Sequence, residues 1–157
     1  MSLARADVLA LVKARVANEH LRRHMLACEA IMRALAVRLG EDAEEWGLAG
    51  LAHDLDSEET ETDFTRHGVE AAAVLSEMGA PAGVVHAVAA HNEATGVVGE
   101  SRLDVGLIVA DQLSGLVTAA ALIRPDKQLA GVQLKSLRKR FREGAFARGV
   151  DRASIAR

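Results

Sequence analysis

Apolar residues recur along most of the chain at the three- and four-residue spacing of an α-helix. The clearest set extends from Leu21 to Leu39 and is followed by Gly40, which is expected to end the helix. The same spacing predicts further helices over Ala43–Asp54, Ala71–Met78, Val84–Asn92 and Leu103–Ile123. The last of these is apolar on nearly every side, which predicts a central buried helix. No segment alternates as a strand does, so the predicted fold class is all-α.

The composition favours helices that pack closely. The 157 residues are 50% hydrophobic but only 3% aromatic, and alanine supplies much of the apolar fraction. Alanine is the best helix former, whereas a sandwich or barrel normally uses many aromatic side chains. We expect a single domain over residues 1–157, because the length suits one core and no repeat or linker interrupts it.

Cysteine usage and charge disfavour the secreted and membrane classes. Cys28 is the only cysteine, so the chain cannot form an internal disulfide. The N-terminal segment carries a charge every few residues, unlike a signal peptide. Asp111 interrupts the longest apolar stretch, Val105–Ile123. We therefore expect a soluble cytoplasmic protein with no membrane partner.

Charge is unevenly distributed along the chain. Residues 135–157 hold eight Lys/Arg and two acids, a net +6, while residues 1–134 hold eleven and twenty, a net −9. The simplest interpretation of the basic end is a solvated amphipathic helix with Leu134, Leu137 and Phe141 on its inner face. A nucleic-acid partner is not expected, because eight basic residues without a set of exposed aromatic residues are weak evidence for one. The apolar residues near this end are compatible with a homodimer.

Helical phase divides the six histidines into inward and outward groups. At 100° per residue, His24 lies beside Cys28 near the apolar stripe of its helix, and His91 shares a face with Val84 and Val88. The same phase places His67 on the face of the Ala71–Met78 stripe. His20 and His86 fall on polar faces, so we expect them to face water.

Two aspartates interrupt apolar sequence and need partners. Asp54 follows His53 at the end of an apolar run, and Asp111 lies within the least polar helix. A buried carboxylate is costly unless it is paired or metal-bound. Together with the inward histidines, these side chains suit one or two divalent cations (Mn, Fe, Ni, Co, Zn or Mg), and two cations can clamp a phosphoryl group.

Each of these residues also has a simpler interpretation. A single inward histidine is more often a hydrogen-bonded core residue than a ligand, and a His-Asp pair is a weak motif by itself. Cys28 is predicted to be a small core residue. A nucleophile formed by Cys28 and His24 is the less favoured alternative.

The order of these residues resembles the HD superfamily of metal-dependent phosphohydrolases. The segments HMLACEAIMRALA around His24, LAGLAHDLD around His53-Asp54 and VADQLSGL around Asp111 carry the resemblance over roughly residues 18–123. The C-terminal segment, about residues 133–157, looks like that of small bacterial HDIG-type proteins. The resemblance implies an HD-domain, phosphodiesterase-like helical bundle.

The resemblance also implies a set of metal ligands. In the family, the first His, the His-Asp pair and the distal Asp bind one metal, which corresponds here to His24, His53, Asp54 and Asp111. Members with two metals add two further histidines, matched by His67 in RHGVEAAAVL and His91 in AAHNE. Asp54 would be the bridging ligand, and Asp54 and His53 are the predicted catalytic residues.

The sequence departs from the family pattern after the His-Asp pair. Many HDIG members continue with Ile-Gly-Lys, where the lysine helps to bind phosphate, but Asp54 is followed here by Leu-Asp-Ser-Glu. This weakens any inference of cyclic dinucleotide cleavage. The candidates for a basic residue that would bind phosphate in place of this lysine are Arg66, Arg124 and Lys127. The acidic loop Asp56–Asp63 is expected to bind an extra cation or to repel polyanions.

The predicted function is therefore hydrolysis of a small phosphorylated substrate, a nucleotide or phosphomonoester, by metal-activated water. The alternative is a catalytically silent HD domain that binds a nucleotide or a protein partner. The missing lysine motivates this alternative.

Overall fold

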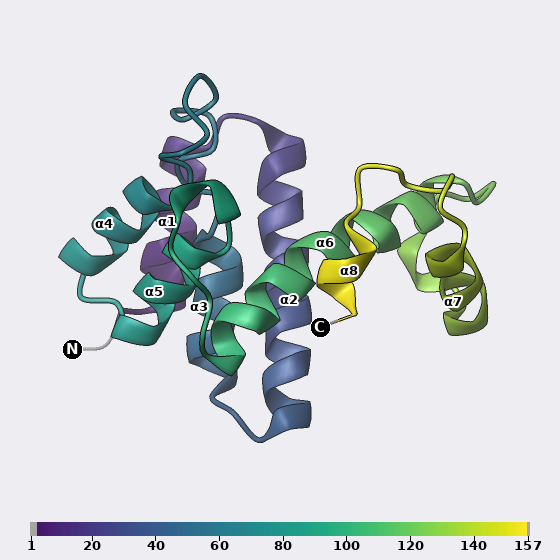
Figure 1. The fold of residues 1–157 in the computed structure, drawn as a ribbon, viewed down its shortest axis with the longest axis horizontal. Coiled ribbons are helices and arrows are strands. Elements are labelled where there is room, and N and C mark those ends of the chain that lie inside the picture. Colours follow the sequence, from purple (N-terminus) through teal and green to yellow (C-terminus); the bar gives the residue numbers. More distant parts are fainter. Residues whose placement is uncertain (1–2, 157) are drawn as a thin grey trace.

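A computed structural model describes residues 3–156, and within this range the fold is all-α, as predicted (Figure 1). Short 3-10 turns at Glu93–Thr95 and Leu129–Gly131 connect some of the helices. The α-helices are α1 (Arg5–Arg15), α2 (Glu19–Leu39), α3 (Ala43–Ala52), α4 (Val69–Glu77), α5 (Ala82–Ala90), α6 (Arg102–Leu122), α7 (Leu134–Arg142) and α8 (Arg152–Ile155).

Helices α2 and α3 form a closely packed pair at the centre of the fold. The side chain of Asn18 caps the start of α2, and that of Asp42 caps α3, each by accepting two backbone N–H hydrogen bonds. The helices approach most closely at Gly50, where a Cβ atom would lie 2.8 Å from the backbone of Cys28. Only glycine allows this approach, which brings the end of α3 against the middle of α2.

Helix α1, which the sequence pattern did not predict, closes one side of this pair. Val8, Val12 and Val16 are almost completely buried against the core. Arg5 of α1 donates two hydrogen bonds to the carboxylate of Glu29 on α2, at 2.5 and 2.8 Å. An apolar stripe and one partly buried ion pair therefore attach α1 to the body of the protein.

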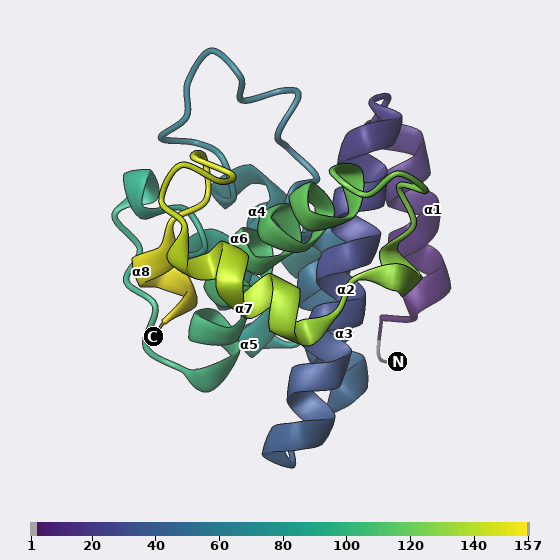
Figure 2. The same ribbon diagram turned by 90° about the vertical axis from the view of Figure 1, so that its right-hand side faces the viewer.

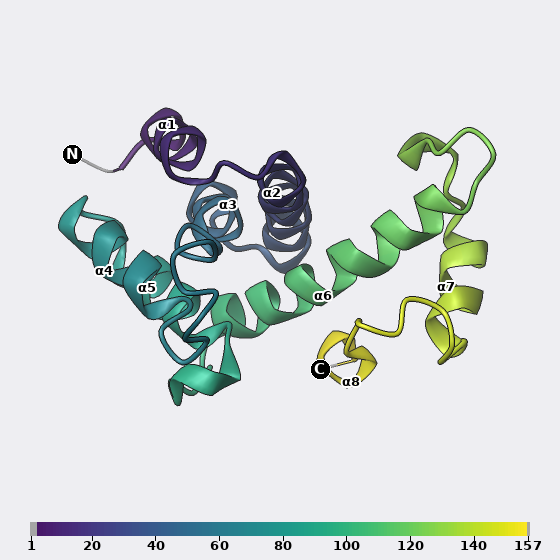
Figure 3. The ribbon, with the colours of Figure 1, turned by 90° about the horizontal axis from the view of Figure 1, so that it is seen from above.

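Helix α6 is only partly the central buried helix that its sequence predicts. Leu107 and Ala110 are completely buried, but Leu122 and Ile123 at the other end are more than half exposed. Figure 3 shows α6 extending from the helical core toward α7. By length and composition α6 is the one helix within residues 3–156 that could cross a membrane, but its first half is a core helix packed on α2 and α5. The prediction was wrong only for the C-terminal end, since Leu116, Ala120 and Ala121 are still buried. An all-apolar helix carries no signal of where its packing partners end.

The C-terminal helices pack beside α6 (Figure 2). Leu137 and Phe141 of α7 are half-buried, as the predicted inner face requires, but Leu134 remains 62% exposed. Arg152 of α8 donates hydrogen bonds to the backbone carbonyls of Phe141 and Phe146, which ties the chain end to α7. Hydrogen bonds from the Arg152 side chain to backbone carbonyls, rather than a hydrophobic core, therefore hold much of this region together.

Candidate metal centre

The six predicted ligands converge on one place, although they come from five parts of the chain. Most of them stand at helix ends, where side chains of neighbouring elements can face one another. The positions are His24 within α2, His53 and Asp54 directly after α3, His67 before α4, His91 directly after α5 and Asp111 in the middle of α6.

One half of the cluster joins α2, α3 and α6. Nε2 of His24 lies 3.2 Å from Nε2 of His53 and 3.1 Å from Oδ1 of Asp111. Oδ2 of Asp54 lies 3.4 Å from both of these imidazole nitrogens. Four potential donor atoms thus surround one point, at separations typical of ligands that share a metal ion.

The other half of the cluster uses the second oxygen of the same carboxylate. Oδ1 of Asp54 lies 3.2 Å from Nε2 of His67 and 3.7 Å from Nε2 of His91. The two imidazole nitrogens are 3.2 Å apart. Asp54 therefore stands between two pairs of histidines and presents one oxygen to each pair.

The outer nitrogen of each histidine has a partner that fixes the orientation of the ring. Nδ1 of His53 donates to the Gly50 carbonyl at 2.9 Å, and Nδ1 of His91 donates to the Val88 carbonyl at 2.6 Å. Nδ1 of His24 donates in the same way to the hydroxyl oxygen of Ser114, at 2.9 Å. With the proton on Nδ1, each Nε2 presents a lone pair to the centre, as in a metal-ligating histidine. The donor set therefore fits divalent cations.

Asp56 performs this orienting role for His67, and the sequence analysis missed it. Its Oδ1 accepts a hydrogen bond from Nδ1 of His67 at 2.9 Å, and its carboxylate also accepts from the backbone N–H groups of Gly68 and Ala71. The side chain is almost completely buried. A sequence signal existed, because a buried acid next to the His-Asp pair requires a partner.

Several acids of the loop Asp56–Asp63 have partners within the fold, and cation binding or anion repulsion by this loop stays a prediction. Besides Asp56, Glu58 accepts hydrogen bonds from the backbone of Ala17 and Asn18, and Glu59 pairs with Arg15. These acids join the loop to the start of α2 rather than face an open cavity. Charge counts along a loop do not show which carboxylates have partners.

The electrostatics of the cluster favour positive charge at its centre. Burial raises the pKa of Asp54, but His53, His67 and His91 outweigh this effect and hold the pKa well below its usual value. Burial lowers the pKa of His24, yet hydrogen bonds, chiefly to Asp111, raise it to about 11. The contacts of His67 with Asp54 and Asp56 raise its pKa to about 9, against the effect of burial. The carboxylates are thus ionised and must be balanced by protons or by cations.

A comparison with protein-family models decides the family. The model described as the HD domain matches residues 21–116, which is more than half of the chain. The chain belongs to the HD-domain family. No curated protein and no solved structure gave a match. The matched range contains all six predicted ligands, and the all-helical fold agrees with an HD domain.

Cys28 lies beside the HD-domain centre, and its sulfur is within 4.8 Å of potential ligand atoms of His24, His53 and Asp111. Its sulfur is 3.7 Å from Nε2 and 3.9 Å from Nδ1 of His24, so it lies alongside the ring and not in front of Nε2. The thiol is completely buried and hydrogen-bonds to the Ala110 carbonyl. Burial raises the pKa of the thiol, which opposes the formation of a nucleophilic thiolate. The predicted role as a small core residue agrees with this position.

The structure gives a different reason for the inward position of His67. The residue precedes α4, and Gly68 between them has a positive φ of 95°. Helical phase therefore does not apply to His67, although its side chain is buried. The turn at Gly68 directs the ring toward Asp54, and a Cβ at this position would lie 2.7 Å from the Val88 carbonyl.

The two histidines predicted to face outward are indeed exposed. His20 lies on the surface of α2. His86 is 45% exposed and pairs with the buried carboxylate of Asp104 at 3.0 Å. Neither belongs to the cluster.

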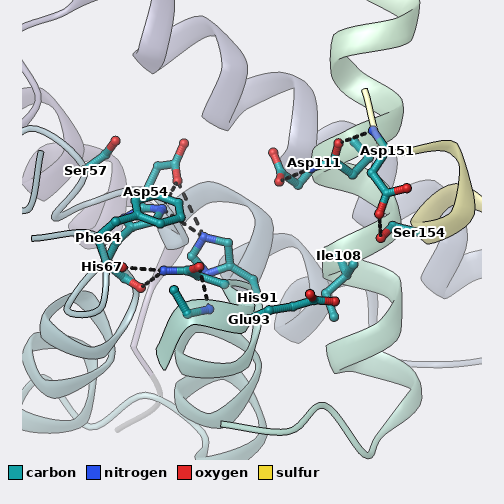
Figure 4. Close-up of a pocket in the computed structure, with 13 residues that line it drawn as sticks. Asp54, Ser57, Phe64, His67, His91, Glu93, Ile108, Asp111, Asp151 and Ser154 are labelled. Carbon is teal, nitrogen blue, oxygen red and sulfur yellow. Dashed lines mark hydrogen bonds and ion pairs between the residues drawn. The ribbon is translucent and has the colours of Figure 1, made fainter. Parts of the chain in front are cut away.

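A pocket with a volume of about 510 Å³ opens onto the cluster (Figure 4). In this view Asp54, His67 and His91 lie on one side, while Asp111 and the α8 residues Asp151 and Ser154 lie on the other. Gln112 accepts a hydrogen bond from the backbone N–H of Asp151, which joins α8 to α6 at the rim. The C-terminal segment therefore contributes to the wall of the pocket.

None of the three basic residues predicted to bind phosphate lines this pocket. Arg66 pairs with Glu70 on the surface of α4. Arg124 pairs with Asp126 beyond the end of α6, and Lys127 lies exposed in the same turn. Among the described residues, no Lys or Arg lines the pocket. The local sequence does not indicate which basic side chains fold toward the centre.

Proposed function

We propose that this HD-domain protein hydrolyses a small phosphorylated substrate, a nucleotide or phosphomonoester, in a reaction that depends on divalent cations. The observation that carries the proposal is the position of Asp54. Its two oxygens face separate histidine pairs at 3.2–3.7 Å, an arrangement suited to bridging two cations. Bound cations would supply Lewis-acid stabilisation of the charge on a phosphoryl group.

Each residue of the cluster has a distinct part in this proposal. His24, His53 and Asp111 would hold one cation, and His67 and His91 the other, with Asp54 shared between them. Asp56, Ser114 and two backbone carbonyls orient the rings, so that little reorganisation accompanies binding. The low pKa of Asp54 keeps its carboxylate ionised, and therefore available to hold cations through both oxygens.

The test combines elemental analysis with an activity screen. The purified protein is loaded with Mn, Fe, Ni, Co, Zn or Mg in turn and assayed against nucleotides, phosphomonoesters and p-nitrophenyl phosphate. We expect one to two equivalents of a cation and turnover that Asp54→Ala abolishes while the helical circular dichroism spectrum is retained. His20→Ala is the matched control, because this histidine is exposed on α2. Full activity in Asp54→Ala would disprove the proposal.

The absence of Lys and Arg from the described lining of the pocket favours a second candidate function. A silent HD domain would bind cations and a nucleotide, or a protein partner, without cleaving a phosphate ester. This candidate predicts cation binding with no turnover of any compound in the screen. Nucleotide binding measured by calorimetry on the loaded protein separates it from a protein that binds only the metal.

A further inference from the structure

One wall of the pocket lies outside the HD-domain match. The match ends at residue 116, whereas Asp151 and Ser154 line the pocket on the side opposite Asp54 (Figure 4). We call these two residues the C-terminal wall. Ser154 is only 5% exposed, so the wall is part of the packed structure. The family match therefore covers the ligand cluster but not this side of the pocket.

Close packing and local hydrogen bonds fix the C-terminal wall on α6. A Cβ atom at Gly115 of α6 would lie 3.3 Å from Cγ2 of Val150, which shows how closely the two segments approach. The hydroxyl of Ser154 donates a hydrogen bond to Oδ2 of Asp151, and Oδ1 of Asp151 accepts one from the backbone N–H of Ala153 at 2.9 Å. Both polar side chains of the wall therefore have defined orientations.

Gln112 connects the C-terminal wall to a predicted metal ligand. Its Nε2 donates a hydrogen bond to Oδ2 of Asp111 at 3.1 Å, and its Oε1 accepts one from the backbone N–H of Asp151 at 2.9 Å. These partners fix the orientation of the amide, because a carboxylate only accepts and a backbone N–H only donates. The other oxygen of Asp111 faces His24 at 3.1 Å. A single side chain thus joins the wall to the cluster that would hold the cations.

Beyond the ligand cluster, the lining of the pocket is largely polar and has no Lys or Arg within residues 3–156. Its polar members include Glu93, Gln112, Asp151 and Ser154, with Phe64 and Ile108 as apolar neighbours. A second phosphate group would meet carboxylates there and no basic partner from Lys or Arg. An ammonium group would be repelled by divalent cations held in the cluster. A hydroxyl group avoids both costs, and it can donate to the carboxylate and serine oxygens of the wall.

We propose that the C-terminal wall binds the hydroxyl-bearing part of a phosphorylated substrate, a polyol, sugar or nucleoside, while the phosphate lies at the cations. The inference rests on the proposed hydrolysis and assigns the part of the substrate that the ligand cluster does not hold. A substrate hydroxyl donates to the Asp151 carboxylate or to the Ser154 oxygen, whose own proton is directed at Asp151. Gln112 is a positioning residue, because it links the wall to Asp111.

The first test compares two phosphate esters that have the same carbon chain. Glycerol phosphate carries hydroxyl groups that propyl phosphate lacks, and both are assayed with the full-length protein loaded with the cation that supports turnover. We expect the KM for glycerol phosphate to be lower by roughly tenfold. Ethanolamine phosphate tests whether the carboxylates select an ammonium group instead. Equal KM values for the first two esters, or a lower KM for ethanolamine phosphate than for glycerol phosphate, would overturn the proposal.

Variants of the wall test its residues. Ser154→Ala and Asp151→Asn should each reduce the preference for glycerol phosphate over propyl phosphate by roughly threefold or more. Gln112→Met keeps the length of the side chain but loses both hydrogen bonds, so it should reduce the preference as well. In this variant the Asp151 amide should also exchange with deuterium faster, which NMR measures. Ser136→Ala, at an exposed position of α7, is the control. A preference that is unchanged in both Ser154→Ala and Asp151→Asn would show that the wall does not contact the substrate.

The proposed hydrolysis can fail separately from this inference. If no ester is turned over with any cation, the hydrolysis proposal fails, and calorimetry on the cation-loaded protein then gives dissociation constants for the same esters. The ratio of those constants, compared between wild type and Ser154→Ala, decides the inference in the same way. A cation-loaded protein that binds neither glycerol phosphate nor propyl phosphate would overturn the inference.

Discussion

The Nδ1 atom of His67 donates a hydrogen bond to Oδ1 of Asp56 across 2.9 Å, and the opposite nitrogen of the ring faces the shared carboxylate of Asp54 at 3.2 Å. The orientation of His67 thus depends on an acid that does not itself face the proposed cation. The same acid accepts two backbone hydrogen bonds at the start of α4. One side chain therefore couples the start of a helix to the geometry of the centre.

Replacing Asp56 should weaken one cation site without removing a ligand. In Asp56→Ala we expect affinity for the cation beside His67 and His91 to fall roughly 10- to 100-fold, as for other orienting partners of ligating histidines. Titration calorimetry with Mn or Co, on protein shown to be folded by circular dichroism, measures the change. The control is Asp63→Ala, which removes an exposed acid of the same loop. Equal affinities in wild type and Asp56→Ala would contradict the orienting role.

The divided environment of Asp54 predicts different stoichiometries for variants of the two histidine pairs. In a protein loaded with two equivalents, His91→Ala should remove one equivalent, because His24 and His53 remain on the other oxygen of Asp54. Asp54→Ala should remove both equivalents. Elemental analysis after gel filtration measures the content, with His20→Ala as the control. Loss of both equivalents in His91→Ala would show that the two halves are not separate sites.

The contact between α1 and α2 predicts a pH-dependent contribution to stability. Burial raises the pKa of Glu29, but hydrogen bonds from Arg5 and Arg33 outweigh it and lower the pKa. A lowered folded-state pKa stabilises the protein above the unfolded-state value of about 4.3, and this contribution is lost as pH falls through the folded-state value. Glu29→Gln should therefore reduce the free energy of unfolding by roughly 1–3 kcal/mol at pH 7.

Urea denaturation of wild type and Glu29→Gln between pH 3 and pH 7 measures this difference. The difference in free energy of unfolding between wild type and Glu29→Gln should be constant near neutral pH and should become smaller at acidic pH. Glu77→Gln on the exposed face of α4 serves as the control. A gap that is as large at pH 3 as at pH 7 would mean that packing rather than ionisation stabilises this contact.

The close approach of α2 and α3 predicts a cost for the smallest possible side-chain addition. The Cβ of Gly50→Ala would lie 2.8 Å from backbone atoms of Cys28, which cannot move aside as a flexible side chain can. We expect a loss of roughly 1–3 kcal/mol in the free energy of unfolding. Gly144→Ala is the matched control, since nothing lies within 4 Å of its added Cβ. Equal midpoints of urea unfolding for both variants would show that the two helices can separate easily.

The sequence predicts those parts of the centre that lie on regular helices. His24 and His91 follow helical phase, since one lies within α2 and the other directly ends α5. His67 was also predicted to face inward, but through a helix that begins two residues later. Its orientation depends on the positive φ of Gly68 and on a distant carboxylate, and neither is visible in a periodic pattern.

The pairing of charged side chains accounts for the remaining differences between prediction and structure. The backbone N–H groups and arginine that engage Glu58 and Glu59 lie about forty residues away in sequence, so the acids of that loop resembled free charges. Arg124 was a candidate for phosphate binding, but its guanidinium pairs with Asp126 two residues away. Sequence spacing predicts which face of a helix a residue occupies, but it does not predict which partner reaches that face.

Under the proposed function, the lining of the pocket favours one order of binding. Asp54 and Asp111 present carboxylates at its floor, and within residues 3–156 no lysine or arginine contributes to its wall. In the cation-free protein the positive charge near a phosphate is that of His24 and His67, which already pair with carboxylates, whereas divalent ions at the centre would attract the same phosphate more strongly. Substrate binding would then depend on the cation concentration. Steady-state kinetics should show an ordered mechanism in which the metal ion binds before the phosphorylated substrate.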